Sequence, residues 1–157
     1  MRRLNRALAL VLTLAVSTTA YAQKTDEARS RFGRGVELFK ENDYRAALIE
    51  FKRAYELAPN YKVLYNLGQT SLELQDYASA LKTFEQYLRE GGKDVPSKRK
   101  AEVEAELGKL RTRVAKITVE VNVEGAEVSI DDIVVGRTPL TEPLTVSAGR
   151  RKISVSK

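Results

Sequence analysis

The sequence contains no cysteine, no histidine and no tryptophan among its 157 residues. Without cysteine the chain can form no disulfide, no thiolate metal site and no thiol nucleophile. Without histidine it lacks the commonest metal ligand and the commonest general base of enzymes. A Ser–His–Asp arrangement is impossible, and nothing singles out a Ser–Lys pair. We therefore expect a protein that is not an enzyme and that uses no cofactor and no metal.

Long apolar runs are also scarce, and the main one follows a short basic start at Arg2, Arg3 and Arg6. It extends from Ala7 to Val16 with one interruption, and a small-x-small sequence, Ala20-Tyr21-Ala22, comes after it. This order is typical of a secretory signal peptide, and the run is shorter than the roughly 20 residues of a membrane span. We expect residues 1–22 to be removed and the chain to be exported to the periplasm or cell envelope. The alternative is an uncleaved membrane anchor.

The positive charge of the sequence belongs partly to that first segment. The whole chain has a net charge of +6, and without its first three arginines 24 Lys and Arg face 21 Asp and Glu, which leaves +3. The remaining charges are of mixed sign and scattered along the chain, as on a solvated surface. We therefore expect no nucleic-acid partner. No integral membrane span is expected in the residues given, and the sequence does not indicate an oligomeric state.

An internal repeat follows, with an offset of 33 positions. Six aligned pairs are identical: Gly35 and Gly68, Asp43 and Asp76, Tyr44 and Tyr77, Ala47 and Ala80, Leu48 and Leu81, Phe51 and Phe84. Each unit predicts two helices, because apolar residues recur at spacings of three and four around a polar turn. Asp43 is expected to cap the second helix of its unit. The glycine and alanine positions predict a close approach of the paired helices.

This pattern resembles the tetratricopeptide repeat, with units at about 28–60 and 61–92. The family's usual aromatic, leucine and final proline are replaced by Arg31, Arg34 and Gly92. Two repeats are fewer than an independent stack requires. We expect a capping helix over 97–115, after Pro96, to complete a helical domain of residues 23–115. A basic helix on anionic lipid is the alternative, which Glu102, Glu104 and Glu106 disfavour.

Near residue 116 the period changes from helical to alternating. Strands are expected at 117–123, around Val128 and Ile130, at 133–135, around Leu144 and Val146, and around Ile153 and Val155. Asp131-Asp132 is interpreted as a turn, since adjacent carboxylates in a hairpin are turn formers more often than metal ligands. The expected fold class is α+β and multi-domain, with helical hairpin repeats, a capping helix and a small antiparallel β module.

Residues 117–157 resemble the PEGA domain through Val123-Glu124-Gly125-Ala126 and Gly136-Arg137-Thr138-Pro139-Leu140. That family usually continues through another pair of strands after the segment matched by Ala148 to Val155. We therefore expect the β module to be truncated. The alternative is a minimal version of the domain whose open strand edge is covered by a partner.

The resemblance to tetratricopeptide repeats implies a concave groove lined by the first helix of each repeat. Asn66 stands where the family often places an asparagine that bonds the backbone of a bound peptide. The candidate partner-binding residues are Arg29, Phe32, Val36, Phe39, Lys62, Tyr65, Asn66, Gln69 and Leu72. For Phe32 and Phe39 the alternative is a place in the helical core. The expected function is that of an exported adaptor or scaffold that holds a protein or peptide partner. The alternative is a cell-surface or wall protein whose PEGA-like module contacts glycan or the S-layer, although residues 117–157 contain no aromatic side chain for sugar stacking.

Overall fold

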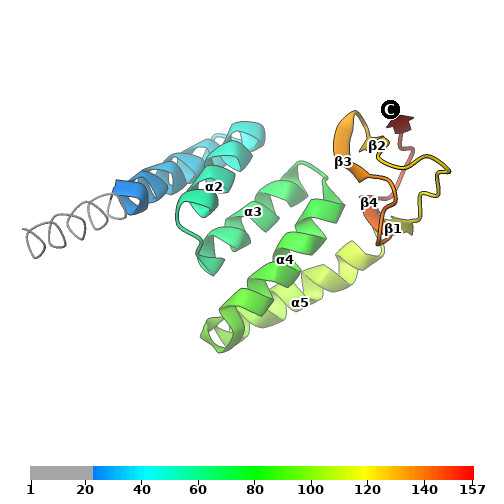
Figure 1. Cartoon of the computed structure of the whole chain (residues 1–157). Helices are drawn as coiled ribbons and strands as arrows, with labels where there is room; N and C mark the ends of the chain where they lie inside the picture. Colours follow the sequence, from blue (N-terminus) through cyan, green and yellow to red (C-terminus); the bar gives the residue numbers. More distant parts are fainter. Residues whose placement is uncertain (1–22) are drawn as a thin grey trace, which may run out of the picture.

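The chain folds into a row of antiparallel helices followed by a small β module. The computed structural model describes residues 23–157, and the predicted signal peptide 1–22 lies outside them. The amino-terminal helix covers 23–40, and the helices after it are α2 (Tyr44–Leu57), α3 (Tyr61–Glu73), α4 (Tyr77–Gly91) and α5 (Ser97–Arg111). Figure 1 shows the amino-terminal helix beside α2, and then α3, α4 and α5 in succession. The predicted α+β class, with repeat-like helices before antiparallel sheets, is confirmed.

Both repeats turn in the same way between their two helices. Asn42 and Gln75, at equivalent positions, have left-handed backbones with φ of 63° and 57°. The aspartate that follows each of them, Asp43 or Asp76, accepts a hydrogen bond from the backbone N–H three residues later, at 3.1 and 3.2 Å. Each aspartate thereby satisfies one of the free N–H groups that open a helix, so the predicted cap at Asp43 is confirmed.

The paired helices approach each other where one of them carries a glycine. A Cβ atom added at Gly35 would lie 2.7 Å from the ring of Phe51, and one at Gly68 would lie 2.5 Å from the ring of Phe84. Both rings are fully buried. The repeated glycine is therefore required for space, because any side chain there would overlap the phenylalanine that fills the core.

The capping helix forms, but it is shorter than the predicted 97–115. α5 ends at Arg111, and Thr112 closes it with a hydrogen bond from its hydroxyl to the carbonyl of Lys109, at 2.8 Å. Val114, which the sequence pattern places on the helix, is the first residue of a strand. The helix gives way to a strand here because Val114 pairs with the distant Ser147. The local spacing of apolar residues cannot predict such a pairing.

The β module consists of two small antiparallel sheets. One pairs β1 (Val114–Ile117) with β4 (Leu144–Ser147), and the other has the order β3 (Ile133–Arg137), β2 (Glu127–Ile130), β5 (Ile153–Ser156). The residues between β2 and β3 are Asp131 and Asp132, with φ of 50° and 67°. Two successive positive φ values are those of a type I′ hairpin turn, so the predicted turn is confirmed.

The strand predicted over 117–123 is wrong. Only Ile117 belongs to a strand, and within residues 23–157 no strand pairs with 118–126. Val119 and Val121 are half-buried. The alternation of apolar and polar residues therefore reflects the burial of these side chains and not hydrogen bonding to a neighbouring strand. The end of this segment is held by Thr138, whose buried hydroxyl donates to the carbonyl of Val123 and accepts from the backbone of Ala126.

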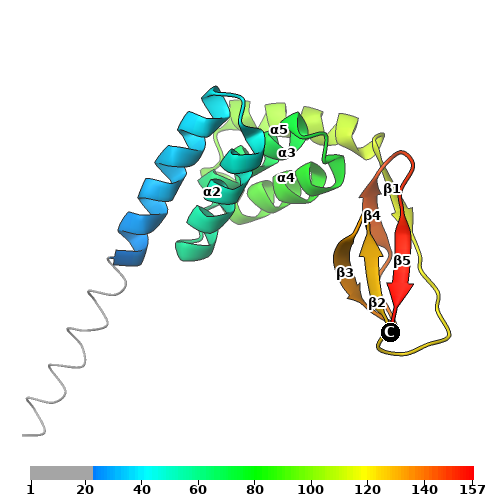
Figure 2. The same ribbon diagram turned by 90° about the horizontal axis from the view of Figure 1, so that it is seen from above.

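The β module is joined to the second repeat by specific contacts at the start of α4. The hydroxyl of Ser147 accepts a hydrogen bond from the backbone N–H of Ala78, at 3.1 Å. The guanidinium of Arg113 lies 4.9 Å from the ring centre of Tyr77 and donates to its hydroxyl at 2.9 Å. Figure 2 shows the module at the opposite end of the row from the amino-terminal helix.

Candidate functional site

The predicted groove residues lie on the amino-terminal helix and on α3, and α5 flanks α3 on its other side. We call the surface formed by these three helices the first-helix face. Two hollows with different lining residues lie on this face.

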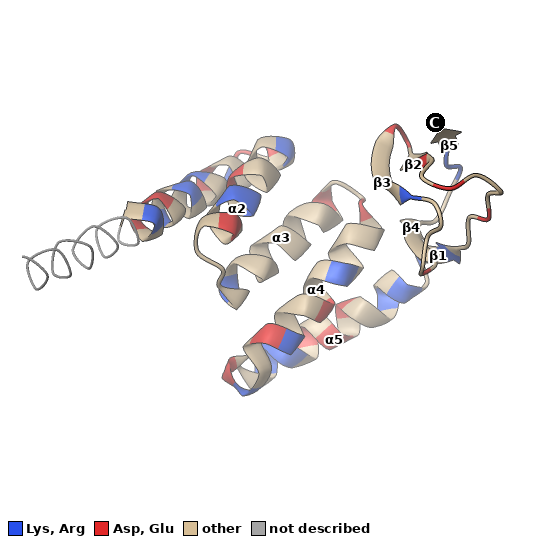
Figure 3. Cartoon of the chain, in the orientation of Figure 1, with Lys and Arg blue, Asp and Glu red and all other residues tan. Residues whose placement is uncertain are grey.

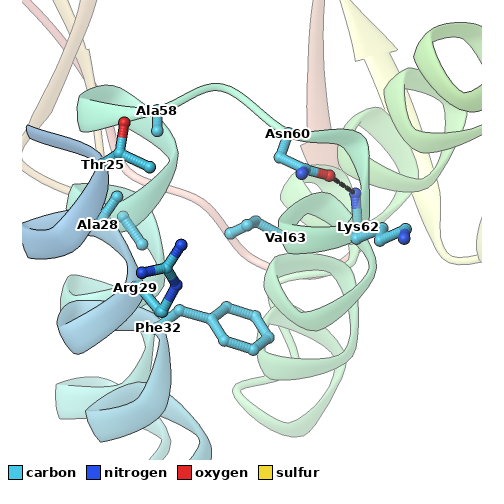
Figure 4. A pocket seen from close by; sticks show the side chains of 9 residues that line it. Thr25, Ala28, Arg29, Phe32, Ala58, Asn60, Lys62 and Val63 are labelled. Atoms are coloured by element: carbon cyan, nitrogen blue, oxygen red, sulfur yellow. Dashed lines mark hydrogen bonds between the residues drawn. The ribbon is translucent and has the colours of Figure 1, made fainter. Parts of the chain in front are cut away.

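The first hollow has a volume of about 320 Å³ and lies between the amino-terminal helix, the end of α2 and the start of α3. Its lining is largely apolar: Thr25, Ala28, Arg29, Phe32, Ala54, Ala58, Asn60, Lys62 and Val63. Figure 4 shows Phe32 extending toward α3 and Val63 pointing back toward the amino-terminal helix. Three predicted residues, Arg29, Phe32 and Lys62, therefore meet at this hollow.

The second hollow has a volume of about 270 Å³ and lies between α3 and α5. It brings together the predicted residues Tyr65, Gln69 and Leu72 with three residues of α5, Glu102, Val103 and Glu106, above the ring of Phe84. The two glutamates are engaged by cations of their own helix, Glu102 by Arg99 at 3.1 Å and Glu106 by Lys109 at 3.0 Å.

Tyr65 already contacts the capping helix, α5. The guanidinium of Arg99 lies 4.2 Å from the centre of its ring and donates a short hydrogen bond to its hydroxyl, which also accepts from Gln69 at 2.9 Å. The Tyr65 ring also lies 5.7 Å from the ring of Tyr87, whose pKa is raised chiefly by burial. Tyr65 and Gln69 therefore help to attach α5, in addition to facing the second hollow.

The other predicted residues, Val36, Phe39 and Asn66, line neither hollow. Val36 and Phe39 are half-buried against the core, and the ring of Phe39 meets that of Tyr44 edge-on with 5.2 Å between centres. Asn66 is half-buried and donates to the carbonyl of Lys62 at 3.3 Å. It lies one turn beyond Lys62 on α3, between the residues of the first hollow and Gln69 of the second.

Comparison with known protein families agrees with this architecture. The tetratricopeptide repeat profile matches residues 28–61 and 61–90, and the PEGA domain profile matches residues 114–157. The chain combines tetratricopeptide repeats with a PEGA domain. No curated protein matches it. The PEGA match begins at Val114, where β1 begins, three residues before the boundary expected from the sequence.

Tetratricopeptide repeats are protein-interaction scaffolds, which directs attention to the face formed by their first helices. In Figure 3 that face is poorest in charge along α3, which carries only Lys62 near its start and Glu73 at its end. The other helices carry residues of both signs along their length. Among residues 23–157, no group of three or more carboxylates is placed to hold a metal ion.

No helix of the described region has the length and apolar character required to cross a membrane.

The sequence interpretation missed several residues that shape the two hollows. Ala28, Ala54 and Ala58 form the first one because they are small, and Glu102 and Glu106 border the second because α5 packs beside α3. A signal for Ala28 and Ala54 was present in the repeat alignment, where the same positions of the second tetratricopeptide repeat carry tyrosines. The position of α5 had no such signal.

Proposed function

We propose that the chain is an exported, non-enzymatic adaptor whose first-helix face holds a segment of a protein partner in the cell envelope. The observation that supports this best is the first hollow, which is apolar within and has Arg29 and Lys62 at its edge. Phe32 and Val63 supply apolar walls, and Asn66 lies on α3 between the residues that line the two hollows. An apolar recess with a few polar groups around it is the usual form of a peptide anchor.

Support for a role without catalysis comes from the state of the charged groups. The glutamates at the second hollow are paired with cations of α5. The pKa of Tyr87 is raised, chiefly by burial of its hydroxyl. A catalytic acid or base needs a free group near the site of reaction. Support for export comes from the basic, apolar and small-residue order of residues 1–22.

The proposal is tested by placing a photo-cross-linking residue at three positions of the full chain in envelope fractions. Asn66 probes the first-helix face, Lys52 is an exposed control on α2, and Ile133, which is 70% exposed, probes the PEGA domain. We expect a discrete cross-linked protein from position 66, no such product from position 52, and a weaker product when Arg29→Glu is added. A product from position 133 alone would support the rival surface-binding role and overturn the proposal.

Export is tested separately by the mass of the protein recovered from the cell envelope. We expect a chain that begins at Gln23, because cleavage after Ala22 fits the small-x-small rule. Recovery of the uncleaved chain from the membrane would support the anchor alternative.

A further inference from the structure

The first hollow has a counterpart in the second repeat, and there the space is filled. At an offset of 33 positions, the three alanines of the hollow correspond to two tyrosines and a glycine: Ala28 to Tyr61, Ala54 to Tyr87, Ala58 to Gly91. The rings of Tyr61 and Tyr87 lie 5.8 Å apart, and a Cβ at Gly91 would lie 2.7 Å from the ring of Tyr61. The second repeat therefore packs an aromatic ring between its two helices at this level.

The first repeat keeps the same framework without the ring. Its turn, its cap and its glycine-to-phenylalanine contact all match those of the second repeat. With alanine at the three positions, the space remains open to the surface and Ala54 forms its floor. Its volume of about 320 Å³ is at the lower end of the roughly 300–1,000 Å³ of ligand pockets, which suits one large side chain better than a whole helix.

The charge at the edge of the hollow is positive. Arg29 and Lys62 are the charged residues among those that line it. Arg29 pairs with Asp26 at 2.9 Å, but both side chains are 75% exposed, and such a pair contributes little and exchanges readily. The ammonium of Lys62 lies 6.0 Å from the ring centre of Tyr61, at the side of the hollow. An acidic group of a partner can therefore replace Asp26 as the partner of Arg29.

We propose that the first hollow anchors an aromatic side chain of the partner segment, with an acidic residue beside it that pairs with Arg29. This rests on the proposed function and names the part of the partner that the adaptor recognises. The incoming ring takes the place that Tyr61 occupies in the second repeat, between two helices whose small residues leave room for it. The acidic neighbour supplies orientation, because the cation lies on one side of the opening.

The test measures fluorescence anisotropy of dye-labelled pentapeptides with the full chain. The parent peptide has one phenylalanine between two glutamates on each side; one variant replaces the phenylalanine by alanine, and another replaces the glutamates by lysines. We expect the parent to bind and each variant to bind at least about tenfold more weakly, with the parent weakened by added salt. Equal affinity for the parent and the alanine peptide, or for the parent and the lysine peptide, would overturn the proposal.

Substitutions in the chain locate the binding. Ala28→Tyr inserts the ring that the second repeat uses, and we expect it to weaken the parent peptide at least about tenfold while the unfolding midpoint stays the same or rises. Ser30→Tyr, on the exposed side of the same helix, is the matched control and should leave the affinity unchanged. Arg29→Glu changes only an exposed side chain, so it tests the charge if Ala28→Tyr does not fold.

Unchanged affinity in the folded Ala28→Tyr chain, or in Arg29→Glu, would show that the hollow is not the anchor. The proposed function fails by a different result. A protein that is cross-linked at Asn66 in both the original and the Ala28→Tyr chain would overturn the anchor and leave the adaptor role standing. A chain that gives no cross-link at Asn66 but binds the parent peptide through the hollow would support the anchor and contradict the adaptor role in the envelope.

Discussion

Two glycines of the amino-terminal helix should respond in opposite ways to the same substitution. Gly33 is exposed, and a Cβ atom added there meets nothing within 4 Å. Gly35 is buried, and a Cβ there would lie 2.7 and 2.8 Å from two atoms of the Phe51 ring. The two positions lie two residues apart in the same helix. Any difference between Gly33→Ala and Gly35→Ala therefore measures the contact with the ring.

The magnitudes follow from two opposing terms. Alanine is favoured over glycine inside a helix by about 1 kcal/mol, so Gly33→Ala should raise the free energy of unfolding by up to about that amount. Gly35→Ala gains the same term, but overpacking a well-packed core costs about 1–3 kcal/mol. Phe51 is fully buried and its ring lies 5.6 Å from that of Phe32, so it has little room to move. We expect Gly35→Ala to be about 2 kcal/mol less stable than Gly33→Ala.

Urea unfolding followed by far-ultraviolet circular dichroism measures this difference, with an unchanged dependence on urea as the check that only stability has changed. Adding Phe51→Leu to Gly35→Ala should cost less than Phe51→Leu costs alone, because the smaller side chain relieves the overlap. Equal midpoints for the two glycine variants, or a Gly35→Ala chain more stable than the original, would refute the argument from the close contact.

Three further predictions concern the PEGA domain. Thr138→Val removes the buried hydroxyl that holds the backbone of 123–126, and it should lower the free energy of unfolding by about 2 kcal/mol in urea unfolding; an unchanged midpoint would contradict this. The pKa of Asp131 is lowered, chiefly by the hydrogen bond from the backbone N–H of Lys152. The stabilisation of the fold by the charged carboxylate is therefore present above about pH 4 and is lost as the pH falls toward the lower folded-state pKa. Asp131→Asn should therefore flatten the decline of the urea midpoint below about pH 4, and the same slope in both chains would count against it. Ser147→Ala should cost about 1 kcal/mol and speed amide hydrogen exchange in the first turn of α4; protection equal to that of the original chain would disprove the role of this hydroxyl.

The repeat could be predicted from the sequence because its determinants are local. The left-handed residues and caps at Asn42-Asp43 and Gln75-Asp76 act within four residues of chain, and they recur at the same offset as the core residues. The β region was predicted less well. The alternation of Val119 and Val121 correctly predicted that their side chains are half-buried. Strand formation, however, requires a partner, and the residues that pair with β1 lie 27 to 33 positions away in β4.

The candidate site was partly predictable for the same reason. Arg29, Phe32 and Lys62 meet at one hollow because helical spacing brings first-helix residues to one face. The division into two hollows depends on α5, whose Arg99 covers Tyr65 although the two are 34 positions apart. No pattern within either helix indicates which distant cation will lie on which ring. The open space at Ala28 becomes visible only when the two repeats are compared position by position.

The contact between α4 and β4 also bears on the order in which the chain assembles. The backbone N–H of Ala78 and the hydroxyl of Ser147 are 69 positions apart, whereas the contacts inside each repeat close much shorter loops. Contacts between distant residues cost more chain entropy and form late, and synthesis delivers the amino-terminal part first. We expect the helices to be assembled before β4 exists, so that its docking on α4 is among the last events of folding.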